Sequence, residues 1–251
     1  MLGLSLAGCK TTGDDITGSI GTPSTPRSDS DWRHAVEVWG GRYRENPNDP
    51  DVAIAYARAL RATGQHAQAA AVLEQASIHN PHNMPLLGAY GRALADTGDY
   101  NQALDVLSRA HTPDQPDWRI LNAQGAVLDQ LGRHAEAQRY YSTALRIAPN
   151  EPSILSNLGL SYALTKDLKR AEATLRQAMA RPDATPKVRQ NLALVVGLQG
   201  RFADAEKIAS ADLPADEAAA NVSYLREMLA KRNDGPKKGG RPYVSPPQAS
   251  N

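Results

Sequence analysis

The histidines and the single cysteine are the residues of this chain that could bind a metal ion or act as a nucleophile. His79 and His82 flank Pro81. Two histidines in a turn can hold a metal weakly, but no cysteine lies near them and they lack the i,i+4 spacing of a helical pair. Cys9 is the only cysteine, which excludes an intramolecular disulfide and a multi-cysteine metal site. We therefore expect no metal and no other cofactor.

Sequence motifs for covalent or phosphate chemistry are also missing. The chain contains neither a G-x-S-x-G nucleophile turn nor a G-x-x-x-x-G-K-[ST] phosphate loop. The carboxylates are spread along the chain without a pair that the sequence marks as an acid and a base. A non-enzymatic protein is therefore the prediction.

The composition indicates an all-α fold. The chain has 251 residues, of which 41% are hydrophobic and only 5% aromatic, so its core is expected to consist of Ala and Leu. A formal net charge of +1 provides no reason to expect nucleic-acid binding, which depends on clustered Lys and Arg. No apolar run approaches the roughly 20 residues of a membrane-spanning helix.

One spacing of 34 residues recurs from Asp31 to Glu217. It is carried by a column of alanines: Ala35, Ala69, Ala103, Ala137, Ala171 and Ala205. Three further columns keep the same register: small residues at Ala57, Gly91, Gly125, Gly159 and Ala193; turn residues at Gly64, Gly98, Gly132, Lys166 and Gly200; and mostly large residues at Trp39, Leu73, Leu107, Tyr141, Leu175 and Ala209. Such a period is typical of stacked helical hairpins.

Each column has a physical reason. Small residues at the Gly125 column let two antiparallel helices approach closely, and the glycine at the Gly132 column ends the first helix in a left-handed cap. The large residue at the Tyr141 column is expected to fill space against the next unit. His66 and His134 share a column with Tyr100 and Phe202, which favours packing over metal binding.

The best copy, residues 118–151, resembles the tetratricopeptide repeat. The family pattern matches Leu121, Gly125, Leu128, Ala137, Tyr141, Ala144 and Pro149. The resemblance implies an all-α solenoid over residues 31–231. It comprises a half-repeat helix (31–45), five repeats starting near Pro50, Met84, Trp118, Pro152 and Pro186, and a capping helix (215–231). Residues 232–251 are rich in Pro and Gly and are expected to be disordered.

In this family the first helix of each repeat lines a concave groove that binds proteins. Transferred by register, the groove positions are Arg58, Arg61, Arg92, Asp96, Arg119, Asn122, Asp129, Gln130, Asn157, Leu160, Leu164, Asn191, Leu194 and Leu198. The groove is therefore predicted to be charged at one end and apolar at the other. The Lys/Asn set of the carboxylate-clamp members is absent, which argues against capture of an acidic C-terminus.

Both ends of this groove allow two interpretations. The leucines are either covered by the capping helix and by packing within the repeats, or exposed to accept an amphipathic segment of a partner. The arginines are either solvated and inert, or Arg58 and Arg92 steer an acidic partner.

The N-terminal residues suggest a lipid anchor. Leu6-Ala7-Gly8-Cys9 resembles the lipobox of bacterial lipoproteins, in which the cysteine is acylated. Residues 1–9 would then be part of a signal, and the polar residues 10–30 a flexible tether. Because Lys10 follows the cysteine in place of the Asp that retains many lipoproteins at the inner membrane, the periplasmic face of the outer membrane is favoured.

Lipobox, tether, repeat number and the ending at residues 220–229 together resemble the TadD-type lipoproteins of the tight-adherence (Flp) pilus system. That resemblance implies a pilotin-like assembly factor whose partner is an outer-membrane secretin or another pilus component. Two alternatives remain. One is a soluble cytoplasmic adaptor in which residues 1–30 are simply disordered, and the other is a periplasmic cell-envelope scaffold unrelated to pili.

Overall fold

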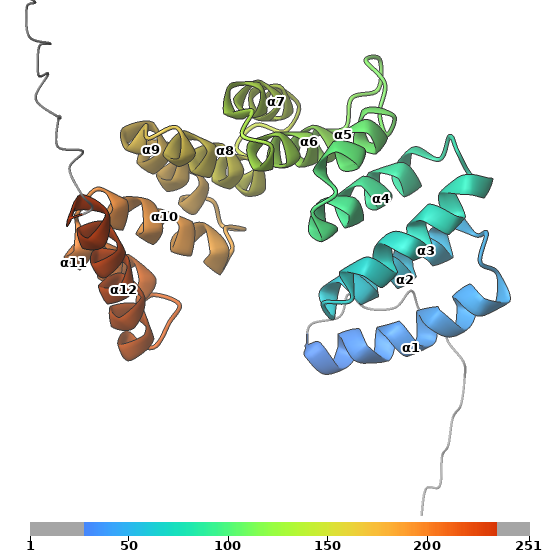
Figure 1. Cartoon of the computed structure of the whole chain (residues 1–251), viewed down its shortest axis with the longest axis horizontal. Coiled ribbons are helices and arrows are strands. Elements are labelled where there is room, and N and C mark those ends of the chain that lie inside the picture. Colours follow the sequence, from blue (N-terminus) through green and yellow to red (C-terminus); the bar gives the residue numbers. More distant parts are fainter. Residues whose placement is uncertain (1–27, 235–251) are drawn as a thin grey trace, which may run out of the picture.

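The computed structural model describes residues 28–234, which form helices joined by short turns (Figure 1). The helices are α1 (Asp29–Glu45), α2 (Pro50–Ala62), α3 (His66–His79), α4 (Met84–Thr97), α5 (Tyr100–Ser108), α6 (Trp118–Gln130), α7 (His134–Ile147), α8 (Pro152–Leu164), α9 (Leu168–Met179), α10 (Pro186–Leu198), α11 (Phe202–Ala209) and α12 (Ala215–Asp234). Predictions about Cys9, residues 10–27 of the tether and the C-terminal tail after Asp234 lie outside the described residues. The end of the predicted tether is corrected, because Ser28 caps α1 and residues 29 and 30 form its start, two residues before the predicted helix at 31–45.

The helices pack as successive antiparallel pairs along an arch. Figure 1 shows α6, α8 and α10 on the inner side of the arch, with α7 and α9 on its outer side. The two ends of the solenoid, α1–α3 and α10–α12, face each other across the open side. The predicted all-α solenoid is confirmed, and the first helix of each repeat lines the concave face.

The helices of a pair touch at the predicted column of small residues. A Cβ atom added at Gly125 would lie 2.5 Å from Cε1 of Tyr141, and one at Gly159 would lie 2.6 Å from Cγ of Leu175. No real Cβ fits at such distances, so the large side chain of the second helix rests on the bare backbone of the first. The sequence predicted that Tyr141 fills space against the next repeat. Its ring instead lies on Gly125 of its own repeat, and it also shares a hydrophobic core with Ile154 of the next repeat.

The turns within the pairs take the expected left-handed conformation. Gly64, Gly98, Gly132 and Gly200 have φ between 73° and 88°. The fourth turn contains Lys166 in place of glycine, and its φ is 66°. A residue with a Cβ is strained there, so this turn retains the geometry of the others at a cost in stability.

The second helices of repeats two and five are shorter than those of the other repeats. Helix α11 has 8 residues. Helix α5 has only 9 residues and ends at Ser108, which the repeat register did not predict. The reason is local, because residues 109–117 contain two prolines and form a turn in which Thr112 pairs with Gln115.

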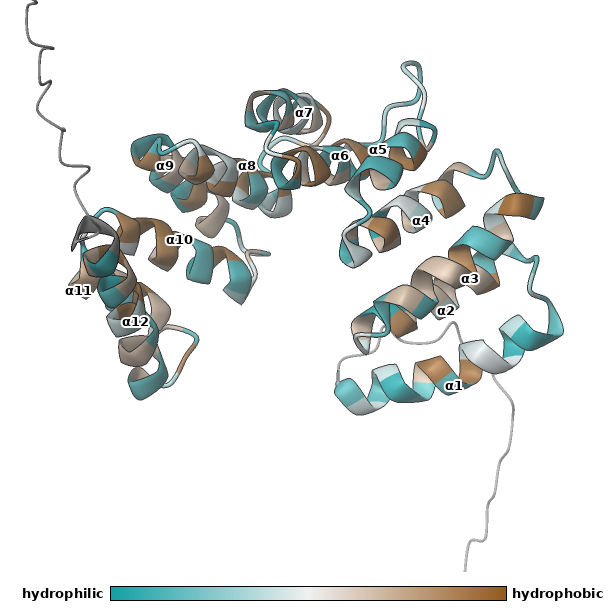
Figure 2. Cartoon of the chain, in the orientation of Figure 1, coloured by the Kyte–Doolittle hydropathy of each residue, from teal (hydrophilic) through white to brown (hydrophobic). Residues whose placement is uncertain are grey.

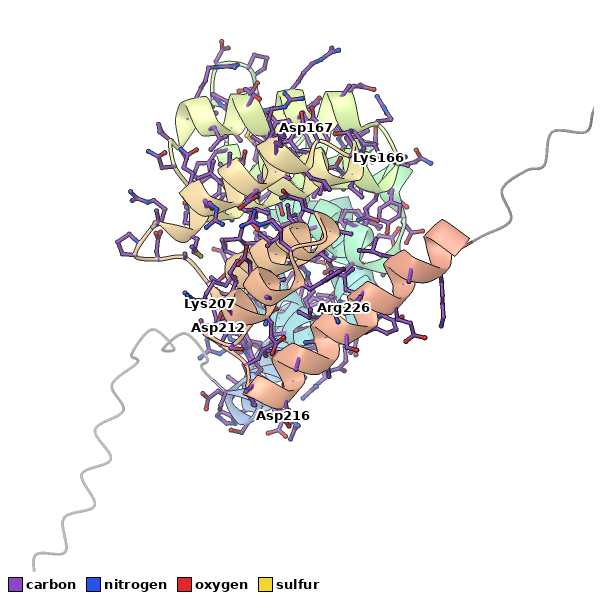
Figure 3. All side chains as sticks on the ribbon, turned by 90° about the vertical axis from the view of Figure 1, so that its left-hand side faces the viewer. Lys166, Asp167, Lys207, Asp212, Asp216 and Arg226 are labelled. Carbon is purple, nitrogen blue, oxygen red and sulfur yellow. The ribbon has the colours of Figure 1, made fainter. Side chains whose placement is uncertain are left out.

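Helix α12 covers the C-terminal end of the solenoid (Figure 3). Ala218 and Val222 are buried against the last repeat, and Leu225 lies over Gly197 of α10. The helix continues to Asp234, three residues beyond the predicted end at Lys231. An i,i+4 ion pair between Lys231 and Glu227, 2.6 Å apart, supports this last part.

Hydrophobic residues gather on one side of most helices, and the C-terminal half of α10 is notably apolar (Figure 2). Within residues 28–234, no helix combines the length and the hydropathy that crossing a membrane requires.

Replacing Lys166 with Gly is expected to stabilise the protein. Glycine adopts the observed φ without strain, which favours the folded state by roughly 1 kcal/mol. The measurement is the midpoint of urea unfolding. Lys169→Gly is the matched control, because Lys169 lies inside α9 and its replacement should destabilise by up to about 1 kcal/mol. A lower midpoint for Lys166→Gly would contradict the strain argument.

Candidate functional site

A pocket of about 350 Å³ opens on the concave face between α2, α4, α6 and α8. It brings together most of the polar residues that the repeat register predicted for the groove. These are Arg61, Arg92, Asp96, Arg119, Asn122, Gln130 and Asn157. Small and apolar residues that sequence reasoning did not single out form the rest of its wall: Ala95, Tyr100, Ala123, Ala126 and Val127.

The polar groups of the pocket are only partly paired with each other. Nε of Arg61 donates to the Asp96 carboxylate, and Nδ2 of Asn157 donates to Oδ1 of Asn122 over 3.0 Å. Each of these bonds joins the first helices of two successive repeats. Burial lowers the pKa of Arg92, and the neighbouring charge of Arg61 lowers it further. The pocket therefore has a positive centre that these contacts do not neutralise.

Three predicted groove residues are engaged elsewhere. The Arg58 guanidinium lies 5.6 Å from the ring centre of Trp32, which ties α2 to α1 by a cation–π contact. Nδ2 of Asn191 donates to Oγ of Ser156 over 2.9 Å and so links α10 to α8. Neither Arg58 nor Asn191 lines the pocket. The third is Asp129.

Asp129 is almost buried and holds three neighbours. Its carboxylate accepts from the Tyr141 hydroxyl at 3.0 Å and from Oγ of Ser161 at 2.9 Å, and Nδ1 of His134 lies 2.8 Å away. Burial raises the pKa of Tyr141 above its usual range, and the Asp129 charge adds to this. Asp129 thus locks two repeats together and is not free to bind a partner.

The residue types around Asp129 are those of a catalytic triad, but the connectivity is different. In a triad the serine donates to the histidine, and the histidine to the carboxylate. Here Ser161 and His134 both contact Asp129. Ser161 is also fully buried, so its hydroxyl cannot reach a substrate. Elsewhere in residues 28–234, no group of three or more His, Cys, Asp or Glu side chains could hold a metal.

The apolar end of the groove remains open to solvent. Leu160 and Leu198 are half-buried, whereas Leu164 and Leu194 are 56% and 42% exposed. The interpretation that packing and the capping helix cover these leucines therefore fails for Leu164 and Leu194. Apolar side chains of this size at the surface are candidates for contact with another protein.

Two residues of α12 extend this apolar surface and were missed by the sequence reasoning. Tyr224 and Met228 are 66% and 51% exposed. Met228 lies 34 residues after Leu194, so it occupies the same register position, and Tyr224 lies one helical turn before it. The signal was present in the sequence, but helix 215–231 was treated only as a cap. We call Leu164, Leu194, Tyr224 and Met228 the apolar strip.

A charged cluster fixes the last repeat, and with it the strip. Glu172 on α9 accepts hydrogen bonds from Gln199 and Arg201, which flank the turn between α10 and α11, and from Arg176. Burial alone would raise the pKa of Glu172, but these hydrogen bonds outweigh it and lower the pKa to about 2. Because Leu194 lies on α10, the cluster helps to set where the strip lies relative to α8.

Comparison with known families agrees with this geometry. Two models of the tetratricopeptide repeat match residues 60–125 and 119–184. Residues 60–184 belong to the tetratricopeptide repeat (TPR) family. The expectation from the sequence is confirmed at this level, and TPR modules as a class are interaction scaffolds. Among curated proteins, none has a significantly similar sequence.

Solved TPR structures share the fold at low sequence identity. PilW, described as a widely conserved type IV pilus biogenesis factor, aligns with a TM-score of 0.67 and 16% identity over 77% of this chain and 91% of PilW. A TPR protein from Parabacteroides merdae aligns with a TM-score of 0.66 and 13% identity over 80% of this chain and 77% of its own. The APC/C complex Cut9–Hcn1 aligns with a TM-score of 0.62 and 16% identity. The alignment covers 79% of this chain but only 40% of the matched chain of that complex.

Replacing Glu172 with Gln is expected to destabilise the TPR domain at neutral pH. Since the pKa of Glu172 is lower in the folded chain than in the unfolded one, its ionised form stabilises the fold fully above about pH 5. This contribution is lost as the pH falls through the folded pKa of about 2. We expect a loss of about 1–2 kcal/mol at pH 7, measured by urea unfolding, and a difference that shrinks towards pH 2.

The control for this prediction is Glu206→Gln, which removes an exposed carboxylate of α11. It should change stability by less than about 0.5 kcal/mol at either pH. If Glu172→Gln and Glu206→Gln lose the same free energy of unfolding, the hydrogen bonds of Glu172 contribute nothing beyond the effect of removing one negative charge.

Proposed function

We propose that this TPR protein is a non-enzymatic scaffold that binds a protein partner along its concave groove and acts in pilus assembly as a pilotin-like lipoprotein. The observation that carries the proposal is the apolar strip, four large side chains left exposed on α8, α10 and the capping helix α12. Helices α8 and α10 bury most of their other apolar side chains, whereas α12 buries only Ala218 and Val222 within residues 215–231. The four exposed side chains are therefore not required for packing. A surface of this kind suits helix-in-groove docking.

The strip and the polar pocket form one continuous surface. Asn157, which lines the pocket, and Leu164 both lie on α8, seven residues apart. At 1.5 Å per residue this places them roughly 10 Å apart along the helix axis. One partner segment can therefore reach both, and the outer helices of the repeats stay free for other contacts.

The role in pilus assembly rests on likeness. The lipobox at Cys9 and the ending at residues 220–229 resemble TadD-type lipoproteins of the Flp pilus system. The similarity in fold to PilW, a pilus biogenesis factor, is in line with this. In this role the acylated Cys9 holds the scaffold on the periplasmic face of the outer membrane, where the groove binds the secretin or another assembly component.

Replacing Leu194 with Glu is expected to abolish binding of the partner without unfolding the protein. A carboxylate in the middle of the strip opposes an apolar segment, and because Leu194 is 42% exposed the core is not disturbed. The measurement is copurification of the secretin with the tagged full-length protein from solubilised envelopes, together with the thermal midpoint.

Ile78→Glu is the matched control, because Ile78 is an equally apolar residue, 66% exposed, at the end of α3 and away from the pocket and the strip. Its secretin yield should match that of the unaltered protein. If both Leu194→Glu and Ile78→Glu retain the secretin, the groove is not its binding site. If neither the unaltered protein nor the Ile78→Glu control copurifies with any pilus component, the proposed role in pilus assembly is wrong.

Replacing Cys9 with Ser is expected to release the protein from the membrane. A thioether-linked lipid cannot form on serine, so the variant should lose incorporation of labelled palmitate and move to the soluble periplasmic fraction. The measurement is fractionation of cells that express the gene with its natural upstream sequence. Cytoplasmic recovery and no labelling of the unaltered protein would support the cytoplasmic adaptor instead.

A further inference from the structure

Arg92 is the charged group of the pocket that the described part of the chain leaves without a hydrogen bond or ion pair. Among residues 28–234 it takes part in no hydrogen bond and no ion pair. Its two arginine neighbours are each engaged. Arg61 binds Asp96, and Arg119 stacks on Trp118 at 4.5 Å with the Asp117 carboxylate 3.9 Å away.

The fold holds Arg92 in the pocket although its charge is disfavoured there. It is half-buried on α4, and burial and the nearby Arg61 both oppose its positive charge. Gly88, one turn earlier on α4, makes room for Ile120 of α6, since a Cβ there would lie 2.5 Å from Cδ1 of Ile120, and the Arg92 guanidinium lies beside this contact. A partly desolvated guanidinium without an anion is costly, which makes the site receptive to one.

The charges around Arg92 indicate which net charge a ligand of this pocket would have. Three arginines, Arg61, Arg92 and Arg119, lie close to two carboxylates, Asp96 and Asp117. One positive charge remains, which a single carboxylate neutralises and a doubly charged phosphate exceeds. The Asn122 amide adds neutral donors, because only its Oδ1 is occupied by Asn157. An arginine fork beside a free amide suits the two oxygens of a carboxylate.

We propose that this pocket binds the side-chain carboxylate of a Glu or Asp in the partner segment, with Arg92 as its main ligand, while the neighbouring apolar strip binds a hydrophobic residue of the same segment. The inference rests on the proposed scaffold function and names the chemistry of its partner. Arg92 lies on α4 and Leu164 on α8, two first helices further along the stack. Because packed helices lie about 8–10 Å apart, the acidic and the hydrophobic residue of the segment are separated by roughly 20 Å, which is about six residues of extended chain.

The test uses the full-length protein with ¹⁵N-labelled arginine and the peptide acetyl-AEAAAAALA-amide, in which Glu and Leu are six residues apart. We expect the Nε–H resonance of Arg92 to shift and saturate on titration. The Gln-containing peptide acetyl-AQAAAAALA-amide should bind at least tenfold more weakly, and so should the Glu peptide to Arg92→Gln. Arg139→Gln, which removes an exposed arginine of α7, should bind the Glu peptide as the unaltered protein does.

Three results would overturn the carboxylate pocket. These are equal binding of the Glu and Gln peptides, an equal loss in Arg139→Gln, and inorganic phosphate that shifts Arg92 at lower concentration than the Glu peptide. Thermal midpoints confirm that each variant is folded. If Leu194→Glu loses the secretin while the unaltered protein binds the Glu and Gln peptides alike, only the carboxylate pocket fails. If the peptides discriminate but the secretin ignores the groove, only the proposed function fails.

Discussion

The structure depends on the close approach of two antiparallel helices within each repeat. At Gly91, Gly125 and Gly159 a large side chain of the second helix rests directly on the backbone of the first. This contact brings the pair together without a hydrophobic core of its own, so each pair must bury its remaining apolar face against the next. Stacking then produces the arch and places the first helices on its inner side (Figure 1).

Between repeats, polar contacts define how one pair lies on the next. Asp129 joins repeat three to Ser161 of repeat four, and Glu172 joins repeat four to Arg201 of repeat five. Buried polar groups of this kind are costly unless they are satisfied, and here both carboxylates are. Because Asp129 and Glu172 are engaged between repeats, they are not available to bind a partner. What remains exposed on the concave face is therefore what packing did not require.

The concave surface has two chemically distinct parts. Around α4 and α6 it is a polar pocket with a surplus of positive charge, and from α8 to α12 it is a row of exposed apolar side chains. A partner that places a carboxylate in the first and an aliphatic side chain in the second is selected on both charge and spacing. A scaffold needs no reactive group for this, and specificity follows from the order of the two parts along the arch.

The sequence alone determined the repeat, the helix pairs, their glycine turns and the concave position of most groove residues, because a 34-residue period reflects packing rules that act within one or two repeats. It did not predict the early end of α5, the packing role of Asp129 or the exposed Tyr224 and Met228. Only the tertiary structure decided these, since they depend on which side chains of neighbouring repeats meet. Register places a residue on a face of a helix, but contacts across the stack decide whether that residue is buried, paired or free to bind.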